Sequence, residues 1–260
     1  MRVLGDRANG LDSAAVCEAA SRALEDAPRT FEELRSLLSA AFPTADERAL
    51  GHAVRMRLPL VMVPDASRWG YPRAASFALA QRWLGRPVGD ETSPESLLQR
   101  YLAAFGPASV ADAQAWSGLS GVGRALDRLR GELMVFRDEG GRELFDLPDA
   151  PRPPPETPAP ARFLPAFDNL VLAHADRTRL IADEHRPLVV TRNLRVNPTF
   201  LCNGCVSGAW TVTRKHNTMT MTLSRFAPIS DAAIAELAEE GERLAAFVAP
   251  DATGFDIAIS

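Results

Sequence analysis

The chain lacks the sequence features of membrane-bound and disulfide-stabilised proteins. None of its apolar runs approaches the roughly 20 residues that a membrane-spanning helix needs. Its first seven residues lack the apolar middle region of a secretory signal peptide. Only three cysteines are present, one of them far from the other two, and these are too few for a disulfide framework. From these absences we expect a cytoplasmic protein.

The common short motifs of catalysis and cofactor binding are also missing. The sequence contains no Walker loop, no G-x-G-x-x-G, no G-x-S-x-G and no H-E-x-x-H. We therefore predict no cofactor and no bound metal. The composition, with 46% apolar and 24% charged residues, excludes a disordered chain, a coiled coil and a collagen-like repeat.

Positive charge is concentrated in one part of the chain. The formal net charge of −4 argues against a protein that binds polyanions with its whole surface. Residues 161–226, however, carry nine basic and four acidic side chains, whereas 1–160 carry 19 and 22, and 227–260 carry one and seven. The central block suits a surface that contacts phosphates. An ordinary solvated sheet face has the same composition, and both interpretations stay open.

The first 150 residues contain a diverged internal repeat. Aligned on a shared proline, each copy has a hydroxyl residue followed three positions later by an acid: Thr30 with Glu33, and Ser109 with Asp112. The first pair is a capping box and the second mimics it, and in both the hydroxyl satisfies free amides at the start of a helix. Further helices are predicted at 14–26, 45–57, 94–105 and 121–130. Both copies then turn to β-strands, and three helices closed by a hairpin form a winged helix, although two unrelated helical hairpins are a competing interpretation.

These observations predict an α+β fold with tandem winged-helix (helix-turn-helix) domains and a C-terminal mixed β-barrel-like domain. The proline-rich segment 148–160 marks the boundary, because proline fixes the backbone and removes a donor. We predict a winged helix at 1–92, a second winged helix at 93–150, a proline-rich linker at 151–161, and a β-rich domain with a terminal amphipathic helix at 162–260.

The third helix of each repeat is the one that a winged helix places in the DNA major groove. In the second copy, Arg124 and Arg128 lie on the outward face together with Asp127. We predict Arg124 and Arg128 as DNA contacts. Because acids dilute both faces and winged helices also bind proteins, we do not expect both copies to touch DNA.

Two further stretches, HADRTR and DEHR, concentrate histidine, aspartate and arginine. Arginines clamp phosphates, and a histidine can make a polar contact or give a proton. The predicted DNA contacts here are His174, Arg177, Arg179 and Arg186. A salt-bridged turn that fixes the entry to the β-rich domain is the other interpretation, and both stay open.

A basic hairpin tip is predicted at 213–217, between two runs of alternating residues. Arg214 and Lys215 are its predicted DNA contacts, since such a tip can reach into a groove or along a phosphate backbone. A solvated tip has the same composition.

The segment Cys202-Asn-Gly-Cys205 has the spacing of a metal or redox motif. Its central Asn-Gly pair, however, is the strongest two-residue signal for a β-hairpin. Because no second ligand pair with zinc spacing occurs, we predict a hairpin with the cysteines as cross-strand neighbours. Metal or redox chemistry is the alternative.

Three blocks occur in the order and at the spacing of one family. They are RYLAAFGPASVADAQAWSGL at 100–119, RFLPAFDNLVLAHADRTR at 162–179 and NGCVSGAW at 203–210. Over roughly residues 12 to 248, the chain resembles the bacterial winged-helix proteins that include the azinomycin-resistance and interstrand-crosslink-unhooking DNA glycosylases. The resemblance implies a concave DNA-binding face and, in active members, hydrolysis of the N-glycosidic bond of bulky alkylated purines.

The resemblance also transfers a structural motif. Its positions in this sequence are Asp168, Asn169, Asn203, Gly204, Gly208 and Trp210. The two cysteines depart from the family's hairpin, which often carries Val-Asp-Gly.

A second departure decides the predicted function. The resemblance implies a further N-terminal winged helix with a Gln-aliphatic-Gln or Gln-aliphatic-Asp pair that orients the attacking water. We expect that this chain starts after that region, whether as a fragment, through a misassigned gene start or as a shortened relative. No Gln-x-Gln or Gln-x-Asp triplet occurs in the sequence, so we predict no catalytic residue.

We therefore predict a DNA-binding relative of alkylation- and crosslink-repair glycosylases that is non-catalytic as it stands. Its expected partner is double-stranded DNA, plain, damaged or alkylated. One alternative is an N-glycosylase completed by a missing N-terminal segment. The other is a transcription regulator or a protein-interaction scaffold.

Overall fold

The computed structural model describes residues 5–67, 70–89 and 92–260 and divides the chain into two compact units, Met1–Thr92 and Ser93–Ser260. Residues 1–4, on which part of the signal-peptide argument rests, lie outside the described residues. No described helix is long and apolar enough to cross a membrane.

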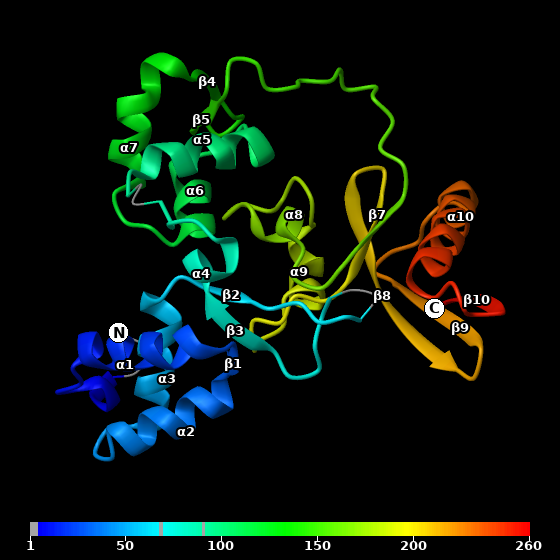
Figure 1. Ribbon diagram of the computed structural model, residues 1–260. Helices are drawn as coiled ribbons and strands as arrows, with labels where there is room; N and C mark the ends of the chain where they lie inside the picture. The colour runs from blue at the N-terminus through cyan, green and yellow to red at the C-terminus, as the bar shows by residue number, and fades with distance from the viewer. Residues whose placement is uncertain (1–4, 68–69, 90–91) are drawn as a thin grey trace. The chain divides into compact units, whose positions relative to one another are not determined.

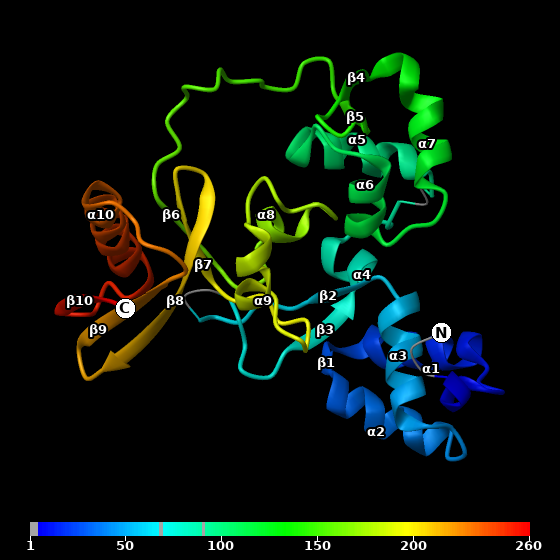
Figure 2. The same ribbon diagram turned by 180° about the vertical axis from the view of Figure 1, so that it is seen from behind.

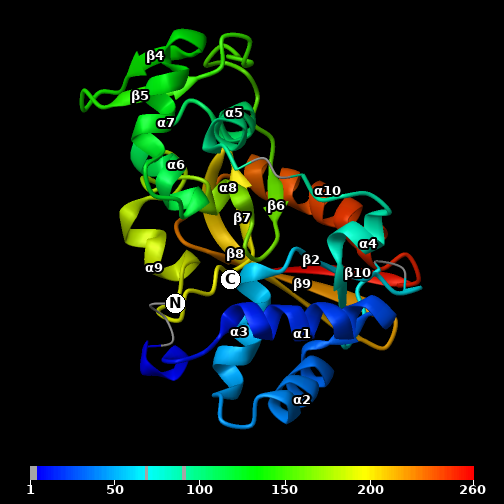
Figure 3. The same cartoon turned by 60° about the vertical axis from the view of Figure 1, so that its left-hand side comes forward.

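The first unit is built from helices and a small antiparallel sheet (Figure 1). Its helices are η1 (Gly5–Ala8), α1 (Ser13–Asp26), α2 (Phe31–Ala41), α3 (Glu47–Arg57) and α4 (Ala80–Leu84), and its strands are β1 (Arg29–Thr30), β2 (Leu60–Met62) and β3 (Ser76–Leu79). Figure 3 shows α1, α2 and α3 gathered at one end of this unit. They enclose a core that includes Val16, Leu38 and Leu50. The sheet order is β1-β3-β2, with both pairs antiparallel.

The second unit begins with a similar set of elements. It holds α5 (Pro94–Phe105), α6 (Val110–Ser117), α7 (Val122–Leu129), η2 (Arg130–Glu132), β4 (Met134–Arg137) and β5 (Glu143–Asp146). Both predicted capping boxes are present: Thr30 with Glu33 at α2, and Ser109 with Asp112 at α6. The predicted helices therefore begin where their sequence signals place them. Tyr101 and Phe145 are among the large side chains that fill the core of α5–β5.

The rest of the second unit is organised around a five-stranded sheet. Its elements are β6 (Arg162–Leu164), α8 (Asn169–Leu172), η3 (Asp183–His185), α9 (Arg186–Val189), β7 (Thr199–Cys202), β8 (Cys205–Lys215), β9 (Thr218–Arg225), α10 (Asp231–Val248) and β10 (Gly254–Ile259). The strand order is β10-β9-β8-β7-β6, and only the β10–β9 pair is parallel. The expected barrel-like closure is not seen among the described strands, because β10 and β6 are the two ends of an open sheet.

The sheet is covered on both faces. Met219, Met221 and Leu223 alternate with threonines along β9 and pack with Leu237 and Ala245 of α10. The segment 171–196 covers other strand residues, Leu201 and Val206, with a second apolar cluster. This arrangement leaves the basic loops of 174–195 attached to a rigid sheet.

The proline-rich segment forms an extended connection between β5 and β6 within the second unit. Residues 151–161 contain no helix or strand and only one local turn, from Pro154 to Thr157 (Figure 2). Arg152 anchors its start, donating hydrogen bonds to the carbonyl oxygens of Leu147 and Pro148 and pairing with the buried Asp146 at 3.4 Å.

Candidate nucleic-acid interface

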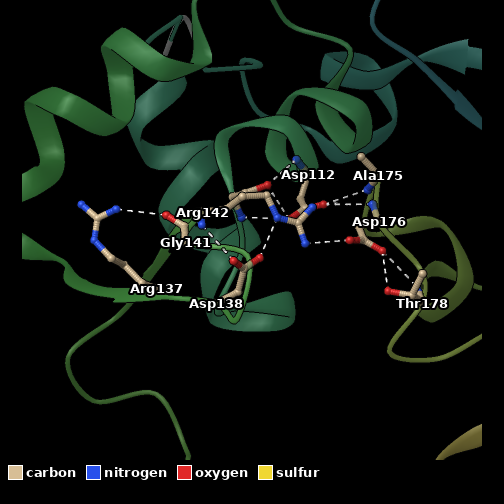
Figure 4. Close-up of polar contacts among 9 residues, drawn as sticks. Asp112, Arg137, Asp138, Gly141, Arg142, Ala175, Asp176 and Thr178 are labelled. Atoms are coloured by element: carbon tan, nitrogen blue, oxygen red, sulfur yellow. Dashed lines mark hydrogen bonds and ion pairs between the residues drawn. The ribbon is translucent and has the colours of Figure 1, made fainter.

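The HADRTR turn is fixed to helix α6 through one buried carboxylate (Figure 4). Oδ1 of Asp112 accepts hydrogen bonds from the backbone amides of Ala175 (2.9 Å) and Asp176 (3.3 Å). Its Oδ2 accepts from the amide and hydroxyl of Ser109 at 2.8 and 2.7 Å. Burial alone raises the pKa of Asp112, but these hydrogen bonds outweigh it and lower the pKa below its usual value. Asp112 is therefore an ionised structural anchor whose two oxygens are both occupied.

A second carboxylate ties the same turn to the β4–β5 hairpin. Asp176 accepts hydrogen bonds from Thr178, and these lower the pKa of Asp176 far below its usual range, assisted by Arg142 at 2.7 Å. Arg142 also pairs with Asp138 at 2.6 Å, as Figure 4 shows. The network fixes the hairpin tip against the turn. This favours the salt-bridged-turn interpretation for Asp176 of the HADRTR stretch.

His174 lies inside this anchor. Its Nε2 is 3.0 Å from the carbonyl oxygen of Phe105. Because a carbonyl oxygen can only accept, Nε2 carries the hydrogen and donates this hydrogen bond. Burial, followed by the nearby Arg179, lowers the pKa of His174 below its usual value. The half-buried imidazole therefore joins the turn to the end of α5.

The three arginines around this turn differ in availability. Arg177 is half-buried and donates from Nε to the carbonyl oxygen of His174 at 3.2 Å. Burial and the neighbouring Arg186 lower the pKa of Arg177 from a very high starting value, so the guanidinium remains charged. Arg179 and Arg186 are exposed. No carboxylate lies within ion-pair distance of these three arginines in the part of the chain that the structure describes.

A charged cavity of about 570 Å³ lies between the turn and the β4–β5 hairpin. Its lining includes four carboxylates, of Asp112, Asp138, Glu139 and Asp176, and three arginines, Arg137, Arg142 and Arg179. The three aspartates all have lowered pKa values and are held by the hydrogen bonds described above. Because such carboxylates are ionised and already accept hydrogen bonds, they hold the turn and the hairpin together at this cavity.

The Cys202–Cys205 segment is a hairpin, as its central pair predicts. Asn203 and Gly204 both have positive φ, at 49° and 76°, which two-residue turns of this kind require. Cys202 and Cys205 lie opposite each other as free thiols. Among the described residues no group of three or more histidine, cysteine or acidic side chains is arranged to hold a metal.

The other residues of the structural motif support the sheet. A Cβ at Gly208 would lie 2.3 Å from the Phe200 ring, so only glycine allows this close approach. Trp210 donates from Nε1 to the carbonyl oxygen of Leu164 at 2.9 Å. Asp168 caps α8 by accepting from the amide of Leu170, and Asn169 is the first residue of that helix.

The β8–β9 hairpin has two neighbouring cations with different surroundings. Arg214 forms two hydrogen bonds to the Asp251 carboxylate, at 2.7 and 3.2 Å, which raise the pKa of Arg214 further. Lys215 is exposed, and within the described chain no acid lies at ion-pair distance from it. The turn itself is the pair at 216–217. Lys215 is therefore the more available of the two predicted contacts.

The candidate recognition helix α7 also carries one arginine without an acidic partner among the described residues and one that is paired with an acid. Arg124 is exposed near the start of the helix, whereas Arg128 pairs with Glu95 of α5. On α3, Arg48, His52 and Arg55 line a cavity of about 620 Å³ together with the acids Glu32 and Glu47. Both helices thus present mixed charge.

Two exposed arginines within 174–195 were not among the predicted contacts. Arg192 and Arg195 lie in the loop between α9 and β7, drawn in yellow in Figure 1. Their signal in the sequence is the stretch Thr-Arg-Asn-Leu-Arg, which contains no acid. They belong to the same basic segment as Arg179 and Arg186.

Comparison with known proteins gives a consistent result. A family model described as DNA glycosylase AlkZ-like matches residues 1–247. The solved structure of DNA glycosylase AlkZ from Streptomyces sahachiroi is similar in fold, with a TM-score of 0.69 and 22% identity over 98% of this chain and 72% of that chain. No curated protein matches the chain. Because the family model spans nearly all of the sequence, the chain belongs to the AlkZ-like family of DNA glycosylases.

Proposed function

We propose that this protein binds double-stranded DNA through the basic segment 174–195 and Lys215, and that it serves in the repair of alkylated or crosslinked DNA. The observation that supports this proposal most directly is a set of exposed basic side chains in this region. Among the described residues, no acid lies within ion-pair distance of them. They are Arg179, Arg186, Arg192, Arg195 and Lys215. Phosphate oxygens are the acceptors that such cations lack within the chain.

The block 161–226 contains few acidic side chains, and two of them already interact with other residues of the chain. Of the four carboxylates in 161–226, Asp168 caps a helix and Asp176 is held by Arg142. The other two, Asp183 and Glu184, are exposed, and nine basic against four acidic side chains leave the block with a formal net charge of +5. Anchoring of the HADRTR turn by Asp112 would hold Arg177 and Arg179 in fixed positions, which reduces the entropy lost on binding phosphates.

We also propose that each three-helix set, α1–α3 and α5–α7, is a winged helix with its following strands, as in the four-part division predicted from the sequence. The mixed charge of α3 and α7 favours binding of bent or damaged duplex over reading of a defined operator, because direct readout needs clustered Arg, Asn or Gln side chains. As a DNA-repair protein of bacterial type it would act in the cytoplasm.

We infer further that these 260 residues do not hydrolyse the N-glycosidic bond by themselves. Asp112 and Asp176, the carboxylates that hold the HADRTR turn, are ionised and occupied by hydrogen bonds, and the sequence contains no Gln-x-Gln or Gln-x-Asp triplet. Hydrolysis of an alkylated purine requires a positioned water and stabilisation of positive charge on the sugar. The alternative is a glycosylase in which a segment other than these 260 residues supplies the residues that position the water.

The test is binding of the purified chain to plain and N7-alkylated duplex over a salt series, with abasic sites counted in the same samples. We expect affinity that falls steeply with salt and no abasic sites. A double variant, Arg179→Ala/Arg186→Ala, should lower the log–log salt slope by about 2. Arg243→Ala, which removes an arginine paired with Glu240 on α10, is the matched control.

Each contrary result has a distinct meaning. Absence of binding at every salt concentration would overturn the DNA-binding proposal and favour a protein-interaction scaffold. Abasic-site formation would overturn the non-catalytic inference alone. A footprint with two-fold symmetry on a palindromic site would favour a transcription regulator.

A further inference from the structure

The loop between α9 and β7 is a short, closed turn. A β-bridge joins Val190 and Val196 at its base. Within it, the amide of Leu194 donates to the carbonyl oxygen of Thr191 at 2.9 Å, and the amide of Thr191 donates to the carbonyl oxygen of Arg195 at 2.8 Å. The turn is therefore defined by backbone hydrogen bonds and holds its tip in one conformation.

The base of this loop is rooted in the core. Val189 and Val196 are buried in the apolar cluster beneath the sheet. The side chain of Asn197 donates from Nδ2 to the carbonyl oxygen of Leu188 at 2.9 Å, and its amide donates to the carbonyl oxygen of Val189. The base of the loop is therefore fixed to the packed core of the second unit.

Leu194 occupies this tip in an unfavourable way. Its φ is +58°, in the left-handed region that glycine or asparagine normally supplies in a turn of this type. Its side chain is 77% exposed, so packing within the chain does not compensate for the strained backbone. The turn therefore presents a large apolar side chain to solvent at its tip.

The chemistry beside Leu194 identifies that contact. Arg192 and Arg195 flank it and are exposed, and no acid lies within ion-pair distance of either in the described part of the chain. A protruding aliphatic side chain between two cations matches a stacked base step between two phosphates. Side chains such as leucine enter such steps, unstack the bases and kink the duplex.

A comparison within the chain supports this assignment. Phe167 is also apolar, 55% exposed and left-handed, with a φ of +60°. It is followed, however, by Asp168, whose carboxylate would repel a phosphate. Among the described non-glycine residues with left-handed backbone, Leu194 is the one that combines an exposed apolar side chain with flanking arginines.

We propose that Leu194 is a wedge that enters between stacked base pairs while Arg192 and Arg195 hold the adjacent phosphates. The inference rests on the proposed DNA-binding function and assigns to it a residue that distorts the duplex. No covalent step is involved. Unstacking of a base is easiest at a damaged or mismatched pair, so the wedge would favour such sites.

The experiment uses a duplex that contains 2-aminopurine, whose fluorescence is quenched by stacking, together with a separate measurement of binding. At saturating protein we expect the wild-type chain to raise the fluorescence several-fold. Leu194→Gly removes the side chain and also relieves the backbone strain, so it should fold at least as well while losing the increase. Leu194→Met keeps an apolar side chain at the tip and should still raise the fluorescence. Phe167→Gly is the control, since it relieves the same strain elsewhere and should leave the signal unchanged.

The flanking arginines have a separate readout. Arg192→Ala and Arg195→Ala should each lower the log–log salt slope of binding by about 0.9. If Leu194→Gly binds DNA and still raises the fluorescence as the wild type does, the wedge is wrong while DNA binding stands. If the wild type binds no DNA, the proposed function fails and the wedge fails with it. Loss of signal in both glycine variants would also contradict a role specific to Leu194.

Discussion

Oδ1 of Asp112 lies 2.9 Å from the amide nitrogen of Ala175, 63 positions further along the chain. The same oxygen accepts from the next amide, and the other oxygen caps α6 through Ser109. One carboxylate thereby completes the capping box at the start of α6 and also positions the turn that carries Arg177 and Arg179. Four donors converge on it, so its removal affects both elements.

Asp112→Ala should lower the free energy of unfolding by about 3 kcal/mol, because it removes a helix cap and leaves the amides of the turn without their acceptor. Chemical denaturation followed by circular dichroism measures this change. Ser230→Ala, which removes the single capping bond at the start of α10, should cost only about 1 kcal/mol. Equal losses in the two variants would show that Asp112 acts as a helix cap alone.

The stability of the second unit should depend on pH through His174. Its pKa is lowered on folding from the ordinary 6.5, so between these two values the unfolded chain binds more protons. Stability is therefore full above about pH 6.5 and falls as the pH drops through the lowered value, by up to about 1.4 kcal/mol per pH unit for one proton. His174→Gln, which keeps a donor toward Phe105, should reduce this slope. An unchanged slope in denaturation curves measured at several pH values would contradict the prediction.

Gly208→Ala should destabilise the sheet. The added Cβ would lie 2.3 Å from the Phe200 ring and 2.5 Å from the carbonyl oxygen of Ser224, and backbone cannot withdraw as a flexible side chain can. We expect a loss of about 2–3 kcal/mol in the free energy of unfolding. At Gly131 a Cβ meets nothing within 4 Å, so Gly131→Ala is the control and should change stability little. A wild-type melting temperature for Gly208→Ala would refute the close-approach argument.

Lys215 and Arg214 should contribute unequally to DNA binding although they are adjacent. Lys215→Ala should lower the log–log salt slope by about 0.9, because its charge is free to displace a counterion from the duplex. Arg214→Ala should lower it less, since its guanidinium is already neutralised by Asp251 at 2.7 Å. Fluorescence anisotropy over a salt series measures both slopes. Equal slopes would mean that the Asp251 pair opens on binding.

The sequence is most informative where local signals begin and end elements. Capping boxes, the Asn-Gly pair and the proline-rich boundary are each encoded within a few residues, and the structure has an element boundary at each of them. The α+β class follows from such signals, whereas the family resemblance rests on the three sequence blocks at 100–119, 162–179 and 203–210. The position of an element in space does not, because it depends on contacts between distant residues.

Strand β10 illustrates a missed element. Phe255, Ile257 and Ile259 alternate with smaller or polar residues, which is a strand pattern. It follows a long helix at the end of the sequence, and only pairing with β9 distinguishes it from an irregular tail. Gly241 of α10 allows this packing, since a Cβ there would lie 2.9 Å from Ile257.

The sequence predicted which residues belong to the candidate site but not which of them are bound by other residues of the chain. His174, Arg128 and Arg214 were all predicted as DNA contacts, and the structure holds them against Phe105, Glu95 and Asp251 respectively. These partners lie between 33 and 69 positions away, beyond any local pattern. The left-handed conformation of Leu194 was equally hidden, because leucine carries no preference for it.

The extended proline-rich connection has a consequence for how the second unit tolerates cleavage. Between 153 and 160 the backbone has little local hydrogen bonding and is exposed, so a site-specific protease sequence placed there should be cut readily. The two fragments remain joined by the Tyr101 hydroxyl on the Ala173 carbonyl oxygen at 2.8 Å, by His174 on Phe105 and by Asp112 on the HADRTR turn. We therefore expect the nicked protein to elute from a sizing column as one species and to separate only in denaturant.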